Sequence, residues 1–529
     1  MLLDAHDLPD GDRILRDVCI VGGGAAGLTI AHELGQAGIR AVVVEAGDVL
    51  MRRAAQRLYE GAIAGESYYP LDACRFRMLG GSTSYWGGWC RPLDAIDFEP
   101  IPWVAESGWP FGRCELDPFY RRAQAICGLG PFDYDAASWK RAPTTSLVRG
   151  GAARFEDAVF QVRPMRFGPV YGTAARASRD VDVLLNATAV GLVTHSSGQR
   201  VIAVRAATRR RRSVVVQADV FMLAAGCIEN ARILLVARRA GQLPADGGEA
   251  VGRFFSDHLH VPLGVLRPRG EVDFYQRQRC HGVTVRGAMS LTDAARRADG
   301  ALGVGITLHS ADDPHDVLSI GQTSRGYAAL RGLIEPLRRG RLPDSPLVHG
   351  AIALRAAPEV CRLVYRRYVR RAARAFIIGC RAEQAPNAES RVTLDGESDS
   401  LGLPKARLEW RLSDRDLSNV ARAQAHLADE LRDHDVEMFP RDGDNGWRRA
   451  IAGGAHHIGT TRMHRDPSRG AVDEHCRVHG TSNLYVAGSS VFPTGGWAPP
   501  TLTVVALALR LADTVAGRAT AREAWTCSK

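Results

Sequence analysis

The chain has 529 residues, more than a single hydrophobic core usually supports, and we therefore expect two joined domains. Its composition of 45% hydrophobic and 24% charged residues is typical of a globular protein and excludes a disordered or fibrous one. The formal net charge of +10 comes almost wholly from arginine, and no nucleic-acid-binding motif surrounds the basic runs at 209–212 and 365–376, so we expect no nucleic-acid partner.

The cysteines and the first residues exclude further classes of protein. The eleven cysteines are scattered and form no CxxC pair, which indicates neither a metal site nor a disulfide framework. Residues 1–17 are too acidic for a signal peptide, and no segment reaches about 18 uninterrupted apolar residues. We therefore expect a cytoplasmic protein without a bound metal and without a membrane span.

Residues 17–48 carry the pattern of a dinucleotide-binding unit. An apolar strand leads into Gly22-x-Gly24-x-x-Gly27, a helical stretch follows, and a second apolar strand ends at Glu45. Gly22 suits a tight turn, Gly24 a close approach of pyrophosphate, and Gly27 close packing of the helix on the strand. The pyrophosphate would lie at the helix N-terminus, and Glu45 would accept hydrogen bonds from a ribose. This pattern predicts a dinucleotide site but does not by itself separate NAD from FAD.

The sequence between residues 77 and 420 carries loop and strand patterns. The loop 77–99 combines glycines with aromatic residues and could lay its backbone against a flat ring. Apolar segments on either side of residues 209–212 predict paired strands, with the arginine run at a hairpin tip. Residues 258–420 are rich in strand patterns and predict the antiparallel sheet of a second domain, interrupted by a helical, basic stretch at 325–375.

The C-terminal part, from about residue 450, predicts a return to the first domain. It ends in the strand-like segment 483–494 and an apolar helix that begins near Pro500. Proline suits the first turn of a helix because it donates no N–H and has a preset φ. The amides from Thr501 onward are then free to face a ligand, and the positive end of the helix would favour the electron-rich O2 edge of a flavin.

Seven segments, in this order along nearly the whole chain, resemble the glucose-methanol-choline (GMC) family of FAD-dependent oxidoreductases. They are "VGGGAAGL" with "VVVEAG", "LGGSTSYWGG", "LAAGCIENARILL", "VGRFFSDHL", "EQAPNAESRVTL", "HHIGTTRM" and "NLYVAGSSVFPTGG" with "PTLTVVALALRLAD". The resemblance implies an α/β fold, with a Rossmann-like FAD-binding domain and a discontinuous α+β substrate domain built on an antiparallel sheet. It implies residues 1–255, with the flavin loop 77–99, for the FAD-binding domain. Residues 256–445, with the helical insert 325–375, would form the substrate-binding domain, and 446–529 the return to the FAD-binding domain.

The resemblance also assigns the FAD site. Some members link FAD covalently through a histidine in the flavin loop, but Tyr85 stands at that place here, so we expect non-covalent FAD. The expected cofactor-binding residues belong to the segments above and to one strand between them: Gly22, Gly24, Ala25, Ala26, Gly27, Glu45, Ala46, Gly80, Gly81, Ser82, Trp86, Gly87, Gly88, Ala189, Ala225, Gly226, Gly488, Ser489, Pro500 and Thr501.

The reaction that the resemblance implies is oxidation of a CH–OH group, in which a base takes the hydroxyl proton while a hydride passes to flavin N5. A histidine suits the role of base because its pKa lies close to neutral pH. The family's histidine opens an H-x-x-G-T element, which here begins at His456, and its neighbour His457 is the less favoured candidate. The substrate would be a sugar, polyol or secondary-metabolite alcohol, and the electron acceptor stays open between oxygen, a quinone and a protein.

Pro499 departs from the family pattern. Members normally carry a second catalytic His or Asn there, and proline offers neither a donor nor a side-chain acceptor. In one interpretation His456 alone suffices, or His457, Tyr85 or Trp497 supplies the lost hydrogen bond. In the other, the enzyme catalyses a different flavin reaction, such as a desaturation, an oxidative rearrangement or a lyase step. We favour altered substrate handling within alcohol oxidation.

Two further functions stay open from the sequence. A non-catalytic flavoprotein could use the basic stretch 325–375 as a contact surface, but it would not need His456 or the whole flavin cradle. An NAD(P)H-dependent flavoenzyme would be expected to carry a second nucleotide-binding fold, whereas the sequence shows one GxGxxG unit. An alcohol-oxidising flavoenzyme accounts for more of these residues than either alternative does.

Overall fold

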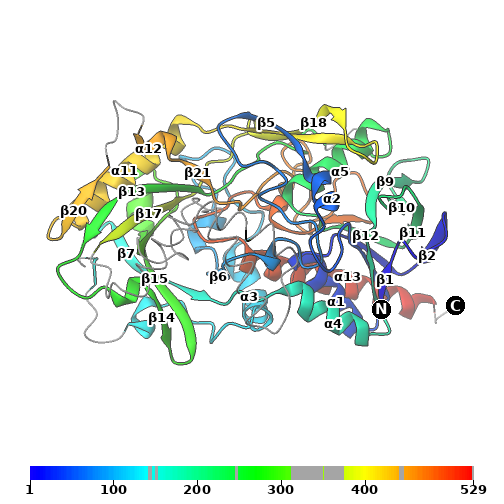
Figure 1. Cartoon of the computed structure of the whole chain (residues 1–529), viewed down its shortest axis with the longest axis horizontal. Helices are drawn as coiled ribbons and strands as arrows, with labels where there is room; N and C mark the ends of the chain where they lie inside the picture. The colour runs from blue at the N-terminus through cyan, green and yellow to red at the C-terminus, as the bar shows by residue number, and fades with distance from the viewer. Residues whose placement is uncertain are drawn as a thin grey trace.

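A computed structural model of the chain confirms the α/β fold (Figure 1). It describes residues 1–140, 146–148, 153–244, 248–310, 350, 375–439 and 446–526. The first sheet has six parallel strands in the order β1 (Leu2–Asp4), β8 (Val181–Leu185), β4 (Ala41–Val44), β3 (Val18–Val21), β12 (Val220–Leu223) and β22 (Leu484–Val486). Every residue of β3 and β4 is apolar and buried, as in a parallel sheet that is covered on both faces.

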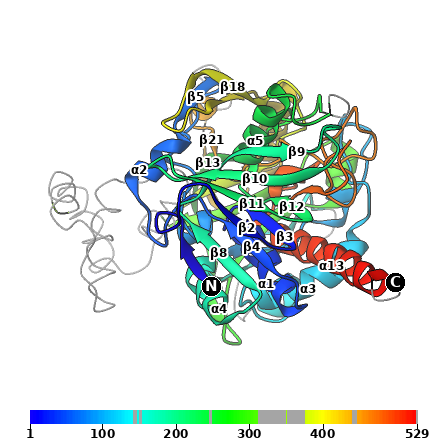
Figure 2. The ribbon, with the colours of Figure 1, turned by 90° about the vertical axis from the view of Figure 1, so that its right-hand side faces the viewer.

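Four helices pack together on one side of this sheet (Figures 1 and 2). They are α1 (Ala25–Gln36), α3 (Arg113–Ile126), α4 (Phe167–Ala177) and α13 (Thr501–Thr526). α1 buries Leu28, Ala31 and Leu34 at a spacing of three residues, which forms one apolar face. α1 contacts α4 and α13, and α13 also contacts α3. The C-terminal segment thus lies against the N-terminal one, since β22 pairs with β12 and α13 packs on α1.

The large second sheet is antiparallel and has nine strands, consistent with the strand patterns of the middle of the chain. Its strands run in the order β20 (Asp435–Met438), β13 (Leu259–Arg267), β17 (Phe376–Ala382), β16 (Val304–Ser310), β15 (Val283–Leu291), β7 (Phe155–Val162) and β6 (Trp89–Cys90), with β14 (Arg277–Cys280) on β15 and β21 (Ala452–Gly453) on β13. α11 (Asp414–Glu430) contacts β17. β6 and β7 precede residue 255, so the boundary expected there does not separate the two sheets. The helical insert expected at 325–375 lies almost wholly outside the described residues.

Two smaller sheets and several short helices complete the arrangement. One sheet has the order β2 (Asp12–Leu15), β11 (Ser213–Gln217), β10 (Val201–Ala207) and β9 (Thr188–Thr194), and the other has the order β18 (Arg391–Ser398), β19 (Pro404–Trp410) and β5 (Gly61–Gly65). The hairpin predicted at 209–212 is confirmed, because these exposed arginines connect the antiparallel strands β10 and β11. The other helices are α2 (Arg53–Gln56), α5 (Cys227–Arg239), α6 (Asp293–Asp299) and α12 (Gly446–Arg449), with 3-10 turns at Arg57–Tyr59, Gly81–Ser84, Ala95–Phe98, Ala136–Trp139, Asp273–Tyr275 and Ser489–Val491.

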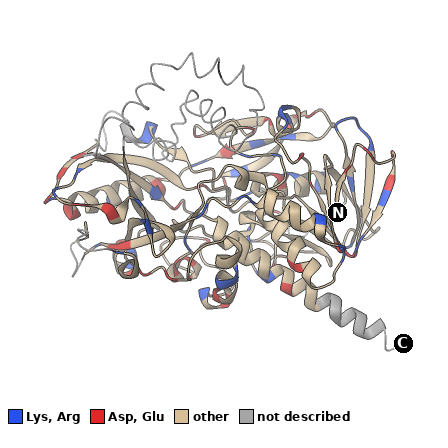
Figure 3. Ribbon diagram, turned by 60° about the horizontal axis from the view of Figure 1, so that its bottom comes forward, with Lys and Arg blue, Asp and Glu red and all other residues tan. Residues whose placement is uncertain are grey.

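In the described part of the chain, basic and acidic residues are interspersed along the ribbon (Figure 3). Of the helices in that part, none is long and apolar enough to cross a membrane. The same residues include no group of three or more His, Cys, Asp or Glu side chains that could hold a metal ion.

The turn before α1 is closed so tightly that Gly27 has no room for a side chain. A Cβ on Gly27 would lie 2.0 Å from the carbonyl oxygen of Gly22. We expect Gly27→Ala to lower the free energy of unfolding by about 1–3 kcal/mol, because the helix must move away from the turn, and to lower the Tm measured by calorimetry. Gly396→Ala is the control, because Gly396 is exposed on β18 and a Cβ there meets no atom within 4 Å. An unchanged Tm for Gly27→Ala would contradict this packing.

Candidate active site

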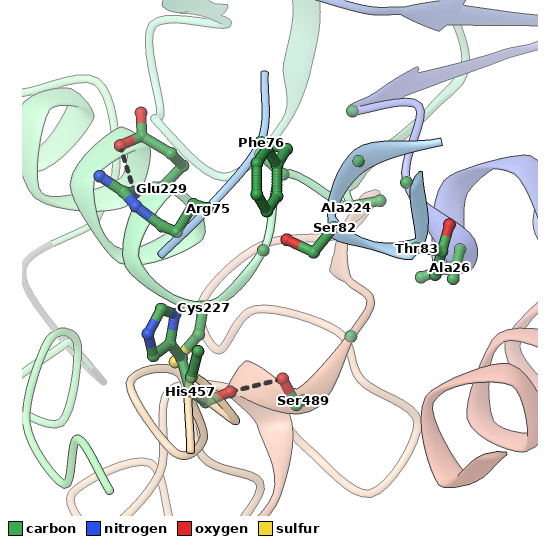
Figure 4. Close-up of a pocket in the computed structure, with 18 of the residues that line it drawn as sticks. Ala26, Arg75, Phe76, Ser82, Thr83, Ala224, Cys227, Glu229, His457 and Ser489 are labelled. Carbon is green, nitrogen blue, oxygen red and sulfur yellow. Dashed lines mark hydrogen bonds and ion pairs between the residues drawn. The ribbon is translucent and has the colours of Figure 1, made fainter. Parts of the chain in front are cut away.

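A cavity of about 760 Å³ extends from the carboxyl ends of β3 and β4 to the large antiparallel sheet. At the sheet it is lined by His260 of β13 and Arg381 of β17. Figure 4 shows that segments far apart in the sequence form its walls, among them those that carry Phe76, Cys227 and His457. Because open α/β sheets bind ligands beyond the carboxyl ends of their parallel strands, this is the expected place for a nucleotide.

The cavity brings together most of the residues predicted to bind FAD and all three predicted catalytic positions. Its lining includes Gly22, Gly24, Ala25, Ala26, Glu45, Ala46, Gly81, Ser82, Trp86, Gly87, Gly88, Ala189, Ala225, Gly226, His456, His457, Gly488, Ser489, Pro499, Pro500 and Thr501. Gly27 and Gly80 do not line it. Gly27 packs against Gly22, and a Cβ on Gly80 would lie 2.6 Å from the amide nitrogen of Gly168 in α4. These two glycines serve close packing in the structure.

Three glycines leave room for a ligand against their backbone. A Cβ on Gly24, Gly226 or Gly488 would meet no heavy atom of the chain within 4 Å. Gly24 directly precedes α1 and Gly226 directly precedes α5, and residues of both first turns line the cavity. Free backbone amides at helix N-termini bind phosphates. The cradle therefore fits the pyrophosphate of a dinucleotide such as FAD.

Glu45 lies at the same end of the cavity and is held by backbone amides. Its Oε2 accepts a hydrogen bond from the amide of Gly23, and its Oε1 accepts one from the amide of Gly47, each at 2.7 Å. Burial raises the pKa of Glu45, although both amides and the charge of Arg77 oppose that shift. Each carboxylate oxygen has a further lone pair, so Glu45 can still accept a hydrogen bond from a ribose hydroxyl.

An ion cluster in the cavity wall was missed by the sequence reasoning. Nη1 of Arg75 lies 2.9 Å from Oε1 of Glu229 (Figure 4), and Arg77 and Arg232 approach Oε2 at 3.5 and 3.3 Å. Arg232 also pairs with Asp399 at 2.6 Å. Although burial opposes ionisation, the three guanidinium groups lower the pKa of Glu229 to about 2. Three cations face two carboxylates here, so this wall carries one net positive charge.

His456 lies against His258, a second residue that the sequence reasoning missed. Nδ1 of His456 is 2.8 Å from Nδ1 of His258, and Nε2 of His258 is 2.9 Å from the carbonyl oxygen of Gly496. A carbonyl only accepts, so Nε2 of a neutral His258 carries the proton and its Nδ1 is an acceptor. Nδ1–H of His456 must donate to that acceptor, which leaves Nε2 of His456 unprotonated. Among the described residues this Nε2 has no hydrogen-bond partner, and His456 lines the cavity.

Asp257 fixes the backbone on both sides of this pair. Its Oδ1 accepts hydrogen bonds from the amide of His456 at 2.8 Å and from the amide of His258 at 2.7 Å, and its Oδ2 accepts one from the hydroxyl of Tyr68. Burial raises the pKa of Asp257 to about 6. Asp257 and His258 both stand in the "VGRFFSDHL" segment, which was the available signal, but their adjacency to His456 depends on the fold.

Burial also sets the protonation state of the two histidines. It lowers the pKa of His456 well below 6.5, and the nearby His258 and Arg381 lower it further. Burial, followed by the charge of Arg381, lowers the pKa of His258 to about 3. Both imidazoles are therefore neutral at neutral pH, and His456 can accept a proton there without first losing one.

Pro499 lines the cavity, but Trp497 is turned away from it. Nε1 of Trp497 donates to Oδ2 of Asp94 at 2.8 Å, and the indole is only 1% exposed. The ring occupies the space beside Gly305, where a Cβ would lie 2.1 Å from it. The interpretation that Trp497 replaces the missing polar group at position 499 is therefore wrong.

His457 and Tyr85, the other residues considered as replacements, both line the cavity. The ring of His457 packs against Phe255, with centroids 5.6 Å apart, and burial lowers the pKa of His457 to about 3. The carbonyl oxygen of His457 accepts a hydrogen bond from Oγ of Ser489 at 2.6 Å (Figure 4). Tyr85 is 56% exposed and stacks on Phe76, with centroids 4.4 Å apart. Either side chain can contact a ligand.

Comparison with known proteins identifies the family of the chain. Residues 17–316 match the family model described as FAD dependent oxidoreductase, and residues 386–508 match the one described as GMC oxidoreductase. The chain is 24% identical to paromamine 6'-oxidase of Streptomyces fradiae, over 97% of this chain and 93% of that protein. It is 26% identical to C-glycoside 3-oxidase of Microbacterium trichothecenolyticum, over 89% of this chain and 83% of that protein.

The fold is also that of solved flavoenzyme structures. The crystal structure of pyridoxine 4-oxidase from Mesorbium loti superposes with a TM-score of 0.60 at 16% identity, covering 94% of this chain and 99% of that one. The first family model alone spans more than half of the sequence, and the second covers the segments that hold His456 and Pro499. The chain therefore belongs to the FAD-dependent oxidoreductases and, within them, to the GMC oxidoreductases.

Proposed function

We propose that the chain oxidises a CH–OH group of a sugar or related alcohol, with non-covalent FAD and with His456 as the base. The observation that carries this proposal is the hydrogen-bond chain from the Gly496 carbonyl through His258 to His456, which leaves Nε2 of His456 free to accept a proton. Two relatives named as oxidases of paromamine and of C-glycosides support a sugar-type alcohol as the substrate.

The residues of the chain divide the work of binding and proton transfer. Gly24, Gly226 and Gly488 would hold the pyrophosphate of FAD and Glu45 its ribose, at the end of the cavity away from the large sheet. When bound, FAD supplies the two-electron acceptor for the hydride of the carbinol carbon. Nε2 of His456 takes the hydroxyl proton as that hydride leaves, which is general-base catalysis.

His258 would act as a positioning residue in this step. Nδ1–H of His456 stays donated to His258 before and after Nε2 is protonated, so the ring need not rotate during proton transfer. Asp257 holds the backbone amide of His456 at 2.8 Å and so fixes where the ring starts. A base that is oriented before the substrate arrives loses little entropy in the transition state.

A substitution at Gly24 tests the cofactor site without disturbing the protein around it. Gly24 has φ −84°, and a Cβ there meets no atom of the chain, so Gly24→Val should fold but block the approach of pyrophosphate. We expect wild-type protein to release stoichiometric FAD on acid denaturation and Gly24→Val to contain almost none. Gly396→Val, at an equally open glycine on β18, should keep its FAD. FAD that stays on the acid-precipitated protein would contradict non-covalent binding, and full FAD content in Gly24→Val would contradict the site.

The two adjacent histidines can be separated by matched substitutions. His456→Gln removes the base but keeps a side chain of similar size, so we expect the rate of anaerobic flavin reduction by an alcohol substrate to fall by about 10²-fold or more with FAD still bound. His457→Gln is the matched control and should lower that rate much less. The reverse ranking, measured by stopped-flow absorbance, would move the role of base to His457.

Pro499 distinguishes altered substrate handling from a different reaction. Asn at this position carries both a donor and an acceptor and adopts the extended backbone that a residue before proline prefers. If the enzyme oxidises alcohols, Pro499→Asn should raise the rate of flavin reduction by simple alcohols, provided that FAD content and Tm are unchanged. Product analysis of both proteins completes the test, since an eliminated or desaturated product from the wild type would favour a lyase or desaturase.

A further inference from the structure

Arg381 is a buried cation in the cavity wall that has no counterion among the described residues. It lies on β17, is 8% exposed and lines the cavity together with His260 and His456. Its Nε donates to Nε2 of His260 at 3.3 Å. Within the part of the chain that the structure describes, neither terminal nitrogen of Arg381 donates a hydrogen bond and no carboxylate pairs with it. A buried charge without a partner is costly, so this arrangement points to a ligand that supplies one.

The surroundings increase the need for an anion. The guanidinium carbons of Arg381 and Arg286 lie 5.4 and 4.8 Å from the centroid of the same ring, that of Trp89. Burial and the charge of Arg286 lower the pKa of Arg381 to about 10, which leaves it charged at neutral pH. Aromatic faces stabilise a cation by about 0.5–2 kcal/mol but bring no negative charge.

The buried acids of this region are engaged elsewhere. Asp257 accepts hydrogen bonds from backbone amides and from Tyr68. Glu383, two residues after Arg381, accepts hydrogen bonds from the amides of Gly303 and Gly496 at 3.0 Å each. It also pairs with the guanidinium of Arg296 at 3.5 Å. Both carboxylates thus serve the backbone around the proposed base, and neither compensates the charge of Arg381.

We propose that Arg381 binds a carboxylate of the substrate, so that the alcohol oxidised at His456 is a hydroxy acid or a sugar acid. The ring of His260 lies 5.9 Å from that of His456 and hydrogen-bonds Arg381, so one small molecule can reach both the base and the guanidinium. A guanidinium matches a carboxylate with two parallel N–H···O bonds. This anchor would orient the substrate where Pro499 offers no polar side chain, and the inference rests on the proposed oxidation at His456.

Binding to the holoenzyme tests the anion site without turnover. The probes are cyclohexanecarboxylate, cyclohexanecarboxamide and cyclohexylammonium, which share one ring and carry no hydroxyl. We expect the Kd of the carboxylate, from perturbation of flavin absorbance, to be about tenfold or more below that of the amide, as for a charge-assisted hydrogen bond, and the ammonium to bind weakest. Equal Kd values for the carboxylate and the amide would overturn the proposal.

Substitutions assign the preference to a residue. Arg381→Gln should abolish the preference for the carboxylate, and Arg381→Lys should keep part of it. Arg277→Gln is the control, because Arg277 lines the same cavity but is exposed, and it should leave the preference nearly unchanged. Loss of the preference in Arg277→Gln but not in Arg381→Gln would overturn the proposal. If Arg381→Gln lacks FAD, the Kd values of the carboxylate and the amide for the wild type and for Arg381→Lys still test the proposal.

Flavin reduction by matched pairs, such as gluconate and glucitol, separates this inference from the proposed function. A higher second-order rate constant of flavin reduction for the acid than for the polyol, with this difference lost in Arg381→Gln, would support both the carboxylate site and the proposed oxidation. Equal, His456-dependent reduction by acid and polyol would overturn the carboxylate site and leave the oxidation intact. Carboxylate binding through Arg381 with no reduction by any alcohol would support the anion site and overturn the proposed function.

Discussion

The hydrogen bond between Nδ1 of His456 and Nδ1 of His258 is the contact on which the proposed chemistry of the site depends. Two imidazole nitrogens at 2.8 Å require one donor and one acceptor, and the Gly496 carbonyl decides which is which. Glu383, which directly follows β17, accepts a hydrogen bond from the amide of Gly496 at 3.0 Å and so holds the residue whose carbonyl fixes the tautomer. His456, the proposed base, is thus oriented by a chain of contacts that begins outside the cavity.

Burial acts on this chain in two ways. It lowers the pKa of both imidazoles and keeps them neutral, which leaves Nε2 of His456 able to accept a proton. It also makes each polar group dependent on a protein partner, which is why Asp257 binds two backbone amides and a tyrosine hydroxyl at once. Exclusion of water by burial strengthens the contacts that hold His456 and raises the free-energy cost of every polar group left without a partner.

The two ends of the cavity differ in how charge is balanced. Near the nucleotide end, Arg75, Arg77 and Arg232 share Glu229, and Asp399 adds a second carboxylate. At the large sheet, Arg381 has the ring of His260 and aromatic faces around it but no carboxylate within the described residues. In the first arrangement each arginine has a carboxylate partner in the protein, whereas Arg381 has none among the described residues. This contrast is consistent with the proposal that the cofactor binds at one end of the cavity and the substrate at the other.

The sequence by itself determined the features that depend on neighbours in the chain. The glycine pattern indicated a turn at Gly22, room for a ligand at Gly24 and a tight contact at Gly27. The structure shows a φ of +110° at Gly22, no atom within 4 Å of a Cβ on Gly24, and Gly27 packed against Gly22. The order of the quoted segments indicated the family, and the H-x-x-G-T element indicated a histidine that does line the cavity. Such features are local because a turn or a helix start is decided within a few residues.

Only the tertiary structure decided which residues meet. His258 and His456 are 198 residues apart in the chain, and the tautomer that leaves Nε2 of His456 free exists only when they touch. Arg381 faces His260 because β17 pairs with β13 in that register, and no local pattern encodes the pairing. Strands β6 and β7 belong to the large sheet, although they precede the domain boundary expected at residue 255. The pairing of antiparallel strands depends on long-range packing, which no local pattern encodes.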